Sequence, residues 1–409
     1  MRNASTAAAA VLVSVTAATA GPNAVRIGVL DDMSGPYASI QGPGDYLAAR
    51  MAAEDFGGRV LGKPVDVVQG DHQNRPDVGA AVASRWYDTE NVDAIFGLGH
   101  SAVALAVHKI SWNKNRIDVV TSAGTSLLTG PNCSPNGAHW AFDTYALAAG
   151  AVKAALDRGD RTFFFVTADY AMGQAIQSDT TRLIEKAGGA VLGSVKHPLG
   201  NSDFSSYVLQ AQASKAKVVV FANAGDDFVN SVKAAVEFGL VSSGQHLAGT
   251  TVFLPDIPAI GLKVTQGMVL TESFYWDLND RTREFSARFE TRHGAPPTEM
   301  QAAVYSSVAH YLKAVAAAGT DEAKAVMAKM RELPVNDFMT RNARLREDGR
   351  LLRDMYLLEV KKPEESQGKW DVLKVIATIP PSEAWRPASE GQCPLFKSND
   401  AISQGGTRP

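Results

Sequence analysis

Short apolar runs alternate with longer amphipathic stretches over the first third of the chain. Each run ends in glycine, aspartate, serine or threonine, as a buried parallel strand does where it opens into a loop. The runs lie at 25–30, 64–69, 92–96 and 117–120, and helices are expected at 44–56, after Pro76 and from about Ala102. Strands and helices that alternate in this way are typical of a parallel, doubly wound α/β sheet.

A second series of the same kind follows a break at 130–133. Its strands are expected at 162–167, 191–195, 217–222 and 247–251, with helices that end near Ala187 and Gly239 and one that opens at 203–206. Long helices then follow at 281–293, 300–318 and 321–331, and two late strands at 354–361 and 370–376. A chain of 409 residues is longer than the chains that usually fold around a single hydrophobic core. We therefore expect two α/β lobes that share the chain by several crossings.

Polar loops follow the third and fourth predicted strands. Residues 97–101 and 121–126 are rich in glycine, serine and threonine, with His100 and Ser101 at the end of the first loop. Ligands of open parallel sheets bind outside the carboxyl ends of the strands, where loop amides and helix N-termini face them. The two loops therefore predict a polar cradle for a ligand, in which no nucleophile or metal site is visible.

Aromatic residues lie at or just after several strand ends. They are Tyr37, Tyr170 and the run Phe274-Tyr275-Trp276. Each is compatible with core packing, but a cluster at the strand-end face favours a cleft for an apolar or aromatic ligand. The pairs Asp31-Asp32 and Asp226-Asp227 lack further oxygen ligands and are interpreted as helix caps or hinge bonds.

Enzyme motifs receive little support. Gly97-x-Gly99-x-x-Ala102 fits a dinucleotide fingerprint, but it lies on the third strand and Ser122 stands where the acidic residue should follow. No G-x-S-x-G occurs, and His100 beside Ser101 would be only half of a triad, between neighbours that rarely point at each other. The eight histidines are scattered, so we expect no metal and no cofactor. A net charge of −3 without a basic run argues against nucleic acid as a partner.

The N-terminus and the two cysteines bear on location. Arg2 precedes an apolar run at 7–15 and the cleavage pattern Ala18-Thr19-Ala20, which predicts a signal peptide over residues 1–20. A disordered or membrane-anchoring tail is the alternative. Cys133 and Cys393 each lie in a proline-flanked loop. In an exported protein such a pair forms one disulfide, whereas in the cytosol it would be two buried thiols.

Several segments together resemble the type I periplasmic binding proteins, in particular the branched-chain amino-acid-binding family of ABC-transporter receptors. The resemblance covers about residues 25–390. Five segments carry it: Val-Arg-Ile-Gly-Val-Leu-x-x-Met-Ser-Gly-Pro-Tyr-Ala at 25–38, the Ser101 loop, residues 121–125, Asp169-Tyr170-x-x-Gly173, and residues 203–206. It implies two Rossmann-like lobes joined by three crossovers, near 142–145, 272–275 and 344–349. Lobe 1 would be 25–143 plus 274–343, lobe 2 would be 144–273 plus 344–390, and 391–409 would be a C-terminal tail.

The same resemblance implies a ligand site. Family members hold the ligand's carboxylate through loops that match Ser101, Ala123 and Thr125, and an aromatic matching Tyr170 covers the ligand. Ile40 stands where leucine binders carry an aromatic residue, and Thr251 stands where amino-acid binders carry the acid that holds the ammonium. A buried ammonium without a counter-charge is costly, although Asp226 is a possible replacement. The expected ligand-binding set is Tyr37, Ile40, His100, Ser101, Ala123, Gly124, Thr125, Tyr170, Asn223, Asp226, Thr251 and Tyr275.

The function expected from these features is that of an exported, periplasmic and monomeric solute receptor for an ABC importer, with the membrane permease as its partner. The solute would be a small carboxylate, most simply an aromatic acid such as a hydroxybenzoate or a cinnamate. A branched-chain or other amino acid is the alternative within the family. A ligand-sensing regulator or a hydrolase on the same scaffold is the alternative from another class.

Overall fold

The computed structural model describes residues 24–396, so the expected signal peptide and the last part of the expected tail lie outside the described residues. The first sheet has six strands in the order β2-β3-β1-β4-β5-β6. All its pairings are parallel except β2 with β3. The strands are β1 (Val25–Asp31), β2 (Arg59–Val60), β3 (Lys63–Asp71), β4 (Ala94–Gly97), β5 (Ile117–Val120) and β6 (Gly137–His139). The four predicted strands are confirmed, whereas β2 and β6 are too short to show a periodicity.

The second sheet has four parallel strands in the order β10-β9-β7-β8. They are β7 (Thr162–Ala168), β8 (Ala190–His197), β9 (Val218–Ala222) and β10 (His246–Gly249). Its helices are α4 (Thr144–Asp157), α5 (Ala171–Lys186), α6 (Ser205–Ala213) and α7 (Asp226–Glu237). The sequence pattern predicted every one of these elements except α4, which begins where the Asp143 carboxylate accepts a hydrogen bond from Ala146 N–H, 2.8 Å away.

The late strands form a third, antiparallel sheet rather than an extension of either series. Its order is β11 (Val269–Glu272), β14 (Met355–Val360) and β15 (Leu373–Ile379). The central strand β14 therefore pairs with residues up to 90 positions earlier in the chain, for example Glu359 with Val269. A short hairpin of β12 (Arg344–Leu345) and β13 (Leu351–Leu352) precedes it.

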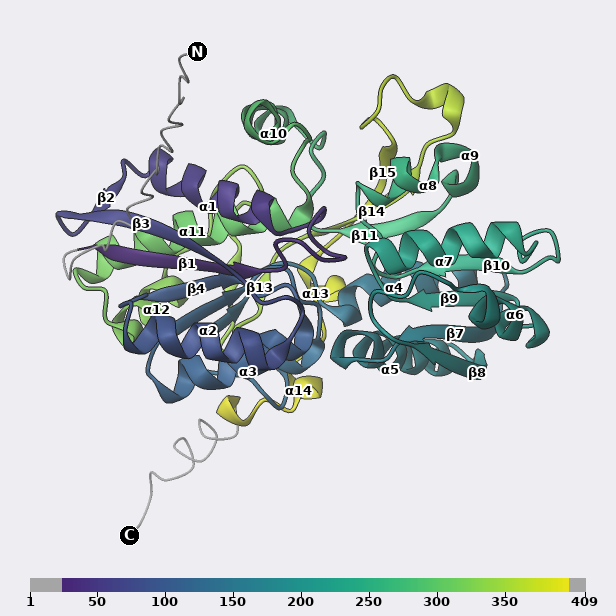
Figure 1. Cartoon of the computed structure of the whole chain (residues 1–409), viewed down its shortest axis with the longest axis horizontal. Helices are drawn as coiled ribbons and strands as arrows, with labels where there is room; N and C mark the ends of the chain where they lie inside the picture. The colour runs from purple at the N-terminus through teal and green to yellow at the C-terminus, as the bar shows by residue number, and fades with distance from the viewer. Residues whose placement is uncertain (1–23, 397–409) are drawn as a thin grey trace, which may run out of the picture.

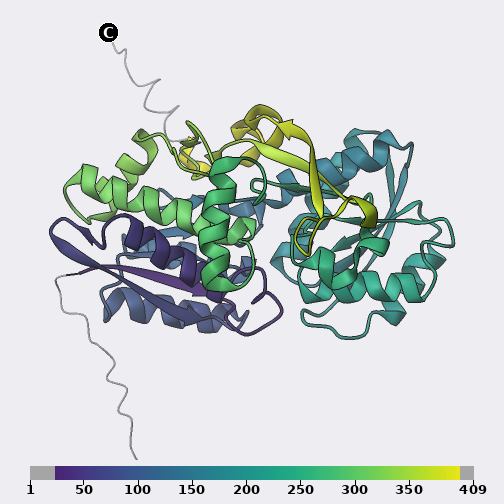
Figure 2. The same ribbon diagram turned by 90° about the horizontal axis from the view of Figure 1, so that it is seen from above.

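Long helices cover the first sheet, and Figures 1 and 2 show the two α/β bodies side by side with the late segments passing between them. The helices are α1 (Pro43–Asp55), α2 (Pro76–Asp88), α3 (Ser101–Asn113), α10 (Asp280–His293), α11 (Glu299–Ala318) and α12 (Ala323–Glu332). Helix α11 begins with a capping box, in which Thr298 and Gln301 satisfy each other's backbone N–H groups. Its long buried face packs against α1, which brings residues far apart in sequence into one core.

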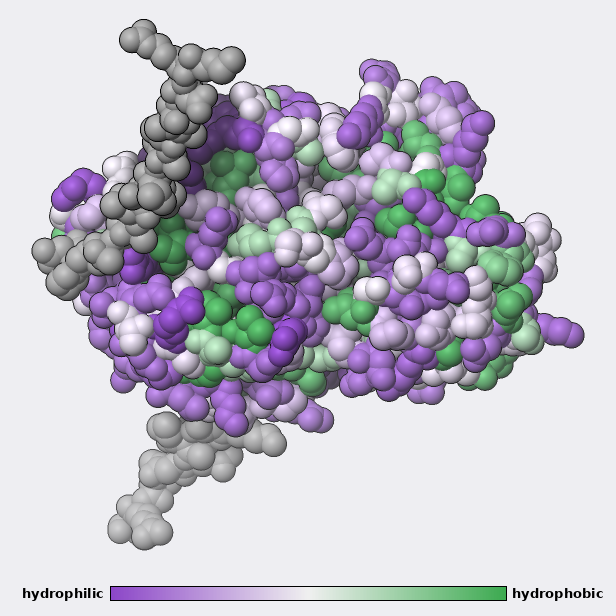
Figure 3. Space-filling view, in the orientation of Figure 1, coloured by the Kyte–Doolittle hydropathy of each residue, from purple (hydrophilic) through white to green (hydrophobic). Residues whose placement is uncertain are grey.

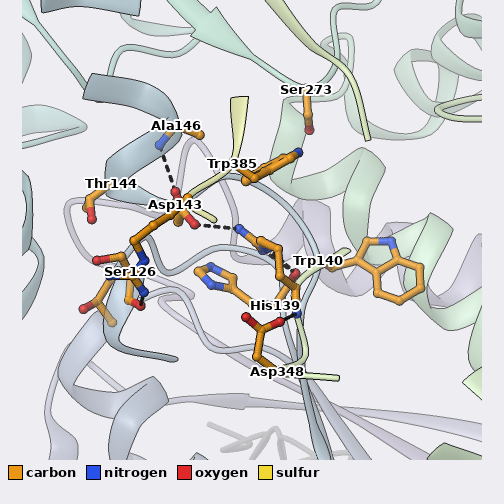
Figure 4. A network of polar contacts seen from close by, with 12 residues as sticks. Ser126, His139, Trp140, Asp143, Thr144, Ala146, Ser273, Asp348 and Trp385 are labelled. Atoms are coloured by element: carbon orange, nitrogen blue, oxygen red, sulfur yellow. Dashed lines mark hydrogen bonds and ion pairs between the residues drawn. The ribbon is translucent and has the colours of Figure 1, made fainter. Parts of the chain in front are cut away.

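A buried polar network holds the chain where it passes between the bodies (Figure 4). Nε of Arg350 donates to the carbonyl of His139 at 3.1 Å, and Nη1 lies 3.2 Å from the Asp143 carboxylate that caps α4. The guanidinium also lies over the Trp385 ring, 4.4 Å from its centroid. The Arg350 side chain is thus tied to both sides of the 139–143 segment, while the division of the chain into lobes given above remains a prediction.

The disulfide between Cys133 and Cys393 is present, with Cα atoms 5.7 Å apart, and it ties the end of the described chain to the loop after η1 (Ser126–Thr129). Short helices α13 (Pro381–Ala384) and α14 (Ala388–Gly391) lead to it. Helices α8 (Asp256–Ile260) and α9 (Leu262–Thr265) lie beside α7 and the third sheet. The surface in Figure 3 is mixed, with apolar residues in small groups among hydrophilic ones. Within residues 24–396, no helix combines the length and the apolar character needed to cross a membrane.

Candidate functional site

The strand ends of the two α/β bodies meet through aromatic side chains. Tyr37 follows β1, Tyr170 follows β7, and their hydroxyl oxygens are 2.6 Å apart. The His100 ring, which follows β4, stacks on Tyr170 with centroids 4.4 Å apart and planes at 18°. The structure therefore brings three of the predicted site residues together across the two sheets. Tyr37 and His100 are almost fully buried there.

The turn that carries Tyr37 is organised by Asp32. The Asp32 carboxylate accepts hydrogen bonds from Gly35 N–H at 2.6 Å, from Tyr37 N–H at 2.9 Å and from the Asn74 amide at 2.7 Å. The neighbouring Asp31 accepts from Gly99 N–H at 2.7 Å. These aspartates thus hold loops of the first body in place. The helix-cap interpretation is wrong for them, since the N-caps of α1 and α3 are Gly42 and His100.

The glycines of the apparent dinucleotide motif have another explanation. A Cβ at Gly97 would lie 1.9 Å from Oδ2 of Asp31, and a Cβ at Gly99 would lie 1.5 Å from Oε1 of Gln41. Gly97 also has φ of +91°, which side chains disfavour. The glycines therefore make room for two side chains of this protein.

The loop after β5 is held by its own backbone. The carbonyl of Ala123 accepts from Nε2 of His139 at 2.7 Å, and the carbonyl of Gly124 accepts from Thr144 N–H at 2.7 Å. A Cβ at Gly124 would be 3.0 Å from the Phe142 ring. Thr125 is buried and its hydroxyl accepts a long hydrogen bond, 3.4 Å, from the first turn of η1. The loop is thus packed and pre-formed, as a rigid ligand cradle requires.

Ser101 is the first residue of α3 and is fully buried. Its hydroxyl has no hydrogen-bond partner among residues 24–396. Nδ1 of His100 instead accepts from Val103 N–H at 3.4 Å and caps the helix. Histidine therefore does not activate the serine, which is what a hydrolase would require.

The remaining predicted residues lie around this group at different depths. Ile40 is buried and its carbonyl accepts from the Thr298 hydroxyl at 2.7 Å, at the start of α11. Thr251 is buried beside Thr250, with hydroxyls 3.3 Å apart. Asn223 is also buried, and its amide donates to Nε2 of His197 and to Ser231. These bonds tie Asn223 to the interior of the second body rather than leaving its donors free.

Asp226 is exposed at the start of α7. Its N–H donates at 3.4 Å to the carbonyl of Pro36, the residue before Tyr37. Partial burial, together with the charge of Asp32, raises the pKa of its carboxyl. Asp226 therefore lies beside the Tyr37 turn, with its carboxylate oriented by no hydrogen bond that the described residues show.

Tyr275 and Trp276 are not part of this group. The Tyr275 hydroxyl and the Trp276 indole both donate to the carbonyl of Trp370, at 3.4 and 3.0 Å. Tyr275 packs in the hydrophobic core beside the third sheet. A cavity of about 580 Å³ lies next to Trp276 and Trp370, and its lining includes none of Tyr37, His100 and Tyr170. Tyr275 and Trp276 therefore donate to a backbone carbonyl instead of joining the Tyr37–His100–Tyr170 group.

The site contains several buried ionisable residues, and the sequence pattern did not single out two of them, His72 and Asp45. Burial lowers the pKa of His72 to about 4 and that of His100 to about 3, so both rings are neutral near pH 7. Burial raises the pKa of Asp45 to about 7, and Asp45 accepts a hydrogen bond from Ser122 at 2.8 Å. Desolvation and the neighbouring Asp45 also raise the pKa of Asp31 well above its usual range. The only signal for His72 was its place directly after β3.

Among the described residues, no group of three histidine, cysteine or acidic side chains is arranged to hold a metal ion. The arrangement instead offers stacked aromatic rings, neutral donors and a rigid polar loop between two α/β bodies. Parallel sheets whose strand ends face each other across aromatic and polar loops define a two-lobed binding protein. Its chemistry is that of enclosing a small molecule.

The chain belongs to the periplasmic binding protein family, whose model matches residues 24–369. It is similar to the crystal structure of a periplasmic binding protein from Burkholderia mallei, at 45% identity, a TM-score of 0.90, and 92% and 100% coverage of this chain and of that one. A branched-chain amino acid ABC transporter periplasmic ligand-binding protein from Burkholderia xenovorans is 40% identical, with a TM-score of 0.79 and coverage of 90% and 99%.

A curated relative, Leu/Ile/Val-binding protein homolog 6 of Brucella melitensis, is 30% identical over 61% of this chain; the match spans only 64% of that relative's length. A solute-binding protein of an ABC transporter from Rhodopseudomonas palustris, solved with 3,4-dihydroxybenzoic acid, shares the fold at 20% identity, with a TM-score of 0.79 and coverage of 90% of this chain and 99% of its own. The type I periplasmic binding protein fold predicted from the sequence is confirmed.

Proposed function

We propose that this protein is the periplasmic solute receptor of an ABC importer and that it closes two lobes around its ligand without transforming it. The observation that carries the proposal is the contact between Tyr37 and Tyr170, which joins the strand ends of the two bodies at 2.6 Å. A ligand that binds the closed arrangement better than the open one shifts the population toward closure. The closed surface is then presented to the membrane permease, and a monomer suffices for this role.

The ligand that the site supports best is a small carboxylate with an aromatic body. Ser101 and the 123–125 loop supply a helix N-terminus and a rigid polar loop, which favour an anion. Tyr37, His100 and Tyr170 supply ring faces for the apolar part. Thr251 provides no counter-charge for an ammonium group. The fold is able to enclose such a molecule, since the Rhodopseudomonas palustris protein was solved with a dihydroxybenzoic acid.

A branched-chain amino acid is the second candidate. The Burkholderia xenovorans protein, at 40% identity, is described as a branched-chain amino acid transporter component. In this chain the ammonium would need Asp226, which lies beside the Tyr37 turn and is exposed. An exposed carboxylate is a weaker partner than a buried one, because water competes for the same charge.

Thermal unfolding of the purified mature protein tests the proposal with 4-hydroxybenzoate, cinnamate, leucine and valine. A ligand at a hundredfold excess over its Kd stabilises the folded state by about 2.7 kcal/mol and raises Tm. We expect shifts with the aromatic acids, confirmed by calorimetric titration, and a smaller shift in Tyr170→Ala. Shifts with leucine and valine alone would select the second candidate. An intact mass that begins near Gly21 would confirm export.

The absence of a shift with all four compounds and with a wider set of amides and dicarboxylates would contradict the receptor proposal. In that case a regulator or a hydrolase on the same scaffold would have to be considered. Incubation of the protein with ester and amide substrates would then distinguish these two, because only a hydrolase would produce turnover.

A further inference from the structure

Three buried hydrogen-bond donors beside the start of α3 have no partner in the described part of the chain. They are Nε2 of Gln41, Nε2 of His72 and the hydroxyl of Ser101. The three residues are 1%, 0% and 0% exposed. They follow β1, β3 and β4, which are neighbours in the first sheet, so their loops meet at one edge.

Two contacts place these donors around the turn at 99–101. Oε1 of Gln41 lies against Gly99, where a Cβ would be only 1.5 Å away. The His72 ring meets the His100 ring edge-on, with centroids 6.5 Å apart and planes at 65°. Ser101 follows directly in the chain. The donors are therefore next to the ring that stacks on Tyr170 from the opposite body.

The hydrogen bonds determine which nitrogen of His72 carries the proton. Asn74 N–H donates to Nδ1 at 3.0 Å, so Nδ1 holds the lone pair and Nε2 holds the hydrogen. Because burial lowers the pKa of His72 to about 4, the ring is a neutral donor near pH 7. It offers one N–H group without adding a charge to the cleft.

A buried donor without an acceptor is expensive, at about 1–3 kcal/mol for each group. Neither carboxylate at the same strand ends accepts from any of the three donors. Asp32 accepts from its own turn and from Asn74. Oδ1 of Asp31 accepts from Gly99, and Oδ2 of Asp31 has no hydrogen-bond partner within residues 24–396. What the three donors lack is an acceptor-rich group that enters from outside, and the positive end of the α3 dipole favours one that is negatively charged.

We propose that Gln41 and His72, together with Ser101, bind the carboxylate of the solute. The inference rests on the proposed function and adds two residues that the family resemblance did not include. Gln41 and His72 would determine specificity for a carboxylate over a neutral head group of the same shape.

The variants Gln41→Met and His72→Phe each remove one unpaired donor and keep most of the side-chain volume, and His72→Phe also removes the acceptor of Asn74 N–H. Calorimetric titration with 4-hydroxybenzoate and with leucine, using whichever binds the wild-type protein, should give a Kd about 10- to 100-fold higher, since each variant loses a hydrogen bond to a charged group. The corresponding carboxamide should bind the wild-type protein more weakly than the acid, and the variants should reduce this difference.

The stability of the ligand-free variants separates binding from a structural role. Removing the unpaired donor in Gln41→Met should leave the ligand-free Tm unchanged or higher, whereas His72→Phe also deprives Asn74 N–H of its acceptor and should lower Tm. Gln245→Met is the matched control, because Nε2 of this buried glutamine donates to the carbonyls of Ala211 and Ala216. The control should lower Tm and leave the affinity unchanged.

Unchanged affinity in both variants would overturn the inference, as would an affinity loss in Gln41→Met that is accompanied by a Tm loss like that of the control. If neither compound nor any other carboxylate binds the wild-type protein, the proposed function itself fails. The two failures are thus distinguishable.

Discussion

The Cys133–Cys393 disulfide permits a quantitative prediction, because it closes a loop between residues 260 positions apart. In the chain-entropy model a loop of that length removes enough freedom from the unfolded chain to stabilise the fold by about 5.5 kcal/mol. The C-terminal segment has native contacts of its own: the Trp385 indole donates to the Arg353 carbonyl at 2.7 Å, and Arg386 donates to the Ser126 carbonyl at 2.8 Å. The double variant Cys133→Ser/Cys393→Ser should therefore keep the native structure and lose stability through the unfolded state.

Urea unfolding followed by circular dichroism and by tryptophan fluorescence measures this loss. The urea midpoint of the variant should be lower by the lost free energy of unfolding, several kcal/mol, divided by the slope m. The unfolding curve of the wild-type protein in reductant should coincide with that of the variant. Solute affinity should not change, since neither cysteine lies in the Tyr37–His100–Tyr170 group. A stability loss below about 1 kcal/mol would refute the reasoning, because the unfolded chain would then gain little freedom when the loop is opened.

Three further predictions concern buried polar groups. Tyr170→Phe removes a hydrogen bond between the two bodies, worth about 1 kcal/mol, so the solute Kd should rise about fivefold in calorimetry; an unchanged Kd would show that the bond does not favour closure. Asp45→Asn should flatten the pH dependence of stability: burial raises the pKa of Asp45 to about 7, so its contribution is full below about pH 4 and is lost as the pH rises through 7. The urea midpoints at pH 5 and pH 8 should therefore lie closer together in this variant than in the wild-type protein. An equal difference between the two midpoints in both proteins would contradict the prediction. Arg350→Met leaves Asp143 as an uncompensated buried charge and should cost about 3–5 kcal/mol in the same assay; a loss similar to that of an exposed arginine such as Arg85 would contradict it.

Local patterns were sufficient to predict most strands and helices of the two α/β bodies. Apolar runs followed by small residues marked β1, β4 and β5, and the helix starts at Pro76 and Ser205 came within a residue or two of the pattern. Helix α4 was missed, although Asp143 and Thr144 begin it in the way that caps usually do. The shortest strands were missed because two or three residues show no periodicity.

The candidate site was only partly predictable. Tyr37, His100 and Tyr170 were expected from their places after strand ends, and the structure brings them together. Tyr275 has the same kind of place in the sequence but packs against Trp370. Gln41 and His72 carried no motif, since an unpaired donor is defined by what surrounds it.

The sequence by itself determined the class of fold, the succession of strand–helix units and the presence of polar loops at their ends, because each of these depends on neighbours within a few positions. Only the tertiary structure decided what the loops do. Gly97 and Gly99 look like a phosphate-binding motif along the chain, yet in space they make room for Asp31 and Gln41. The antiparallel sheet of β11, β14 and β15, the stack of His100 on Tyr170 and the neutral state of His72 all require residues far apart in the chain to meet. Such contacts form because whole apolar faces of helices and sheets are buried against each other, and a local sequence pattern does not show which faces will pack together.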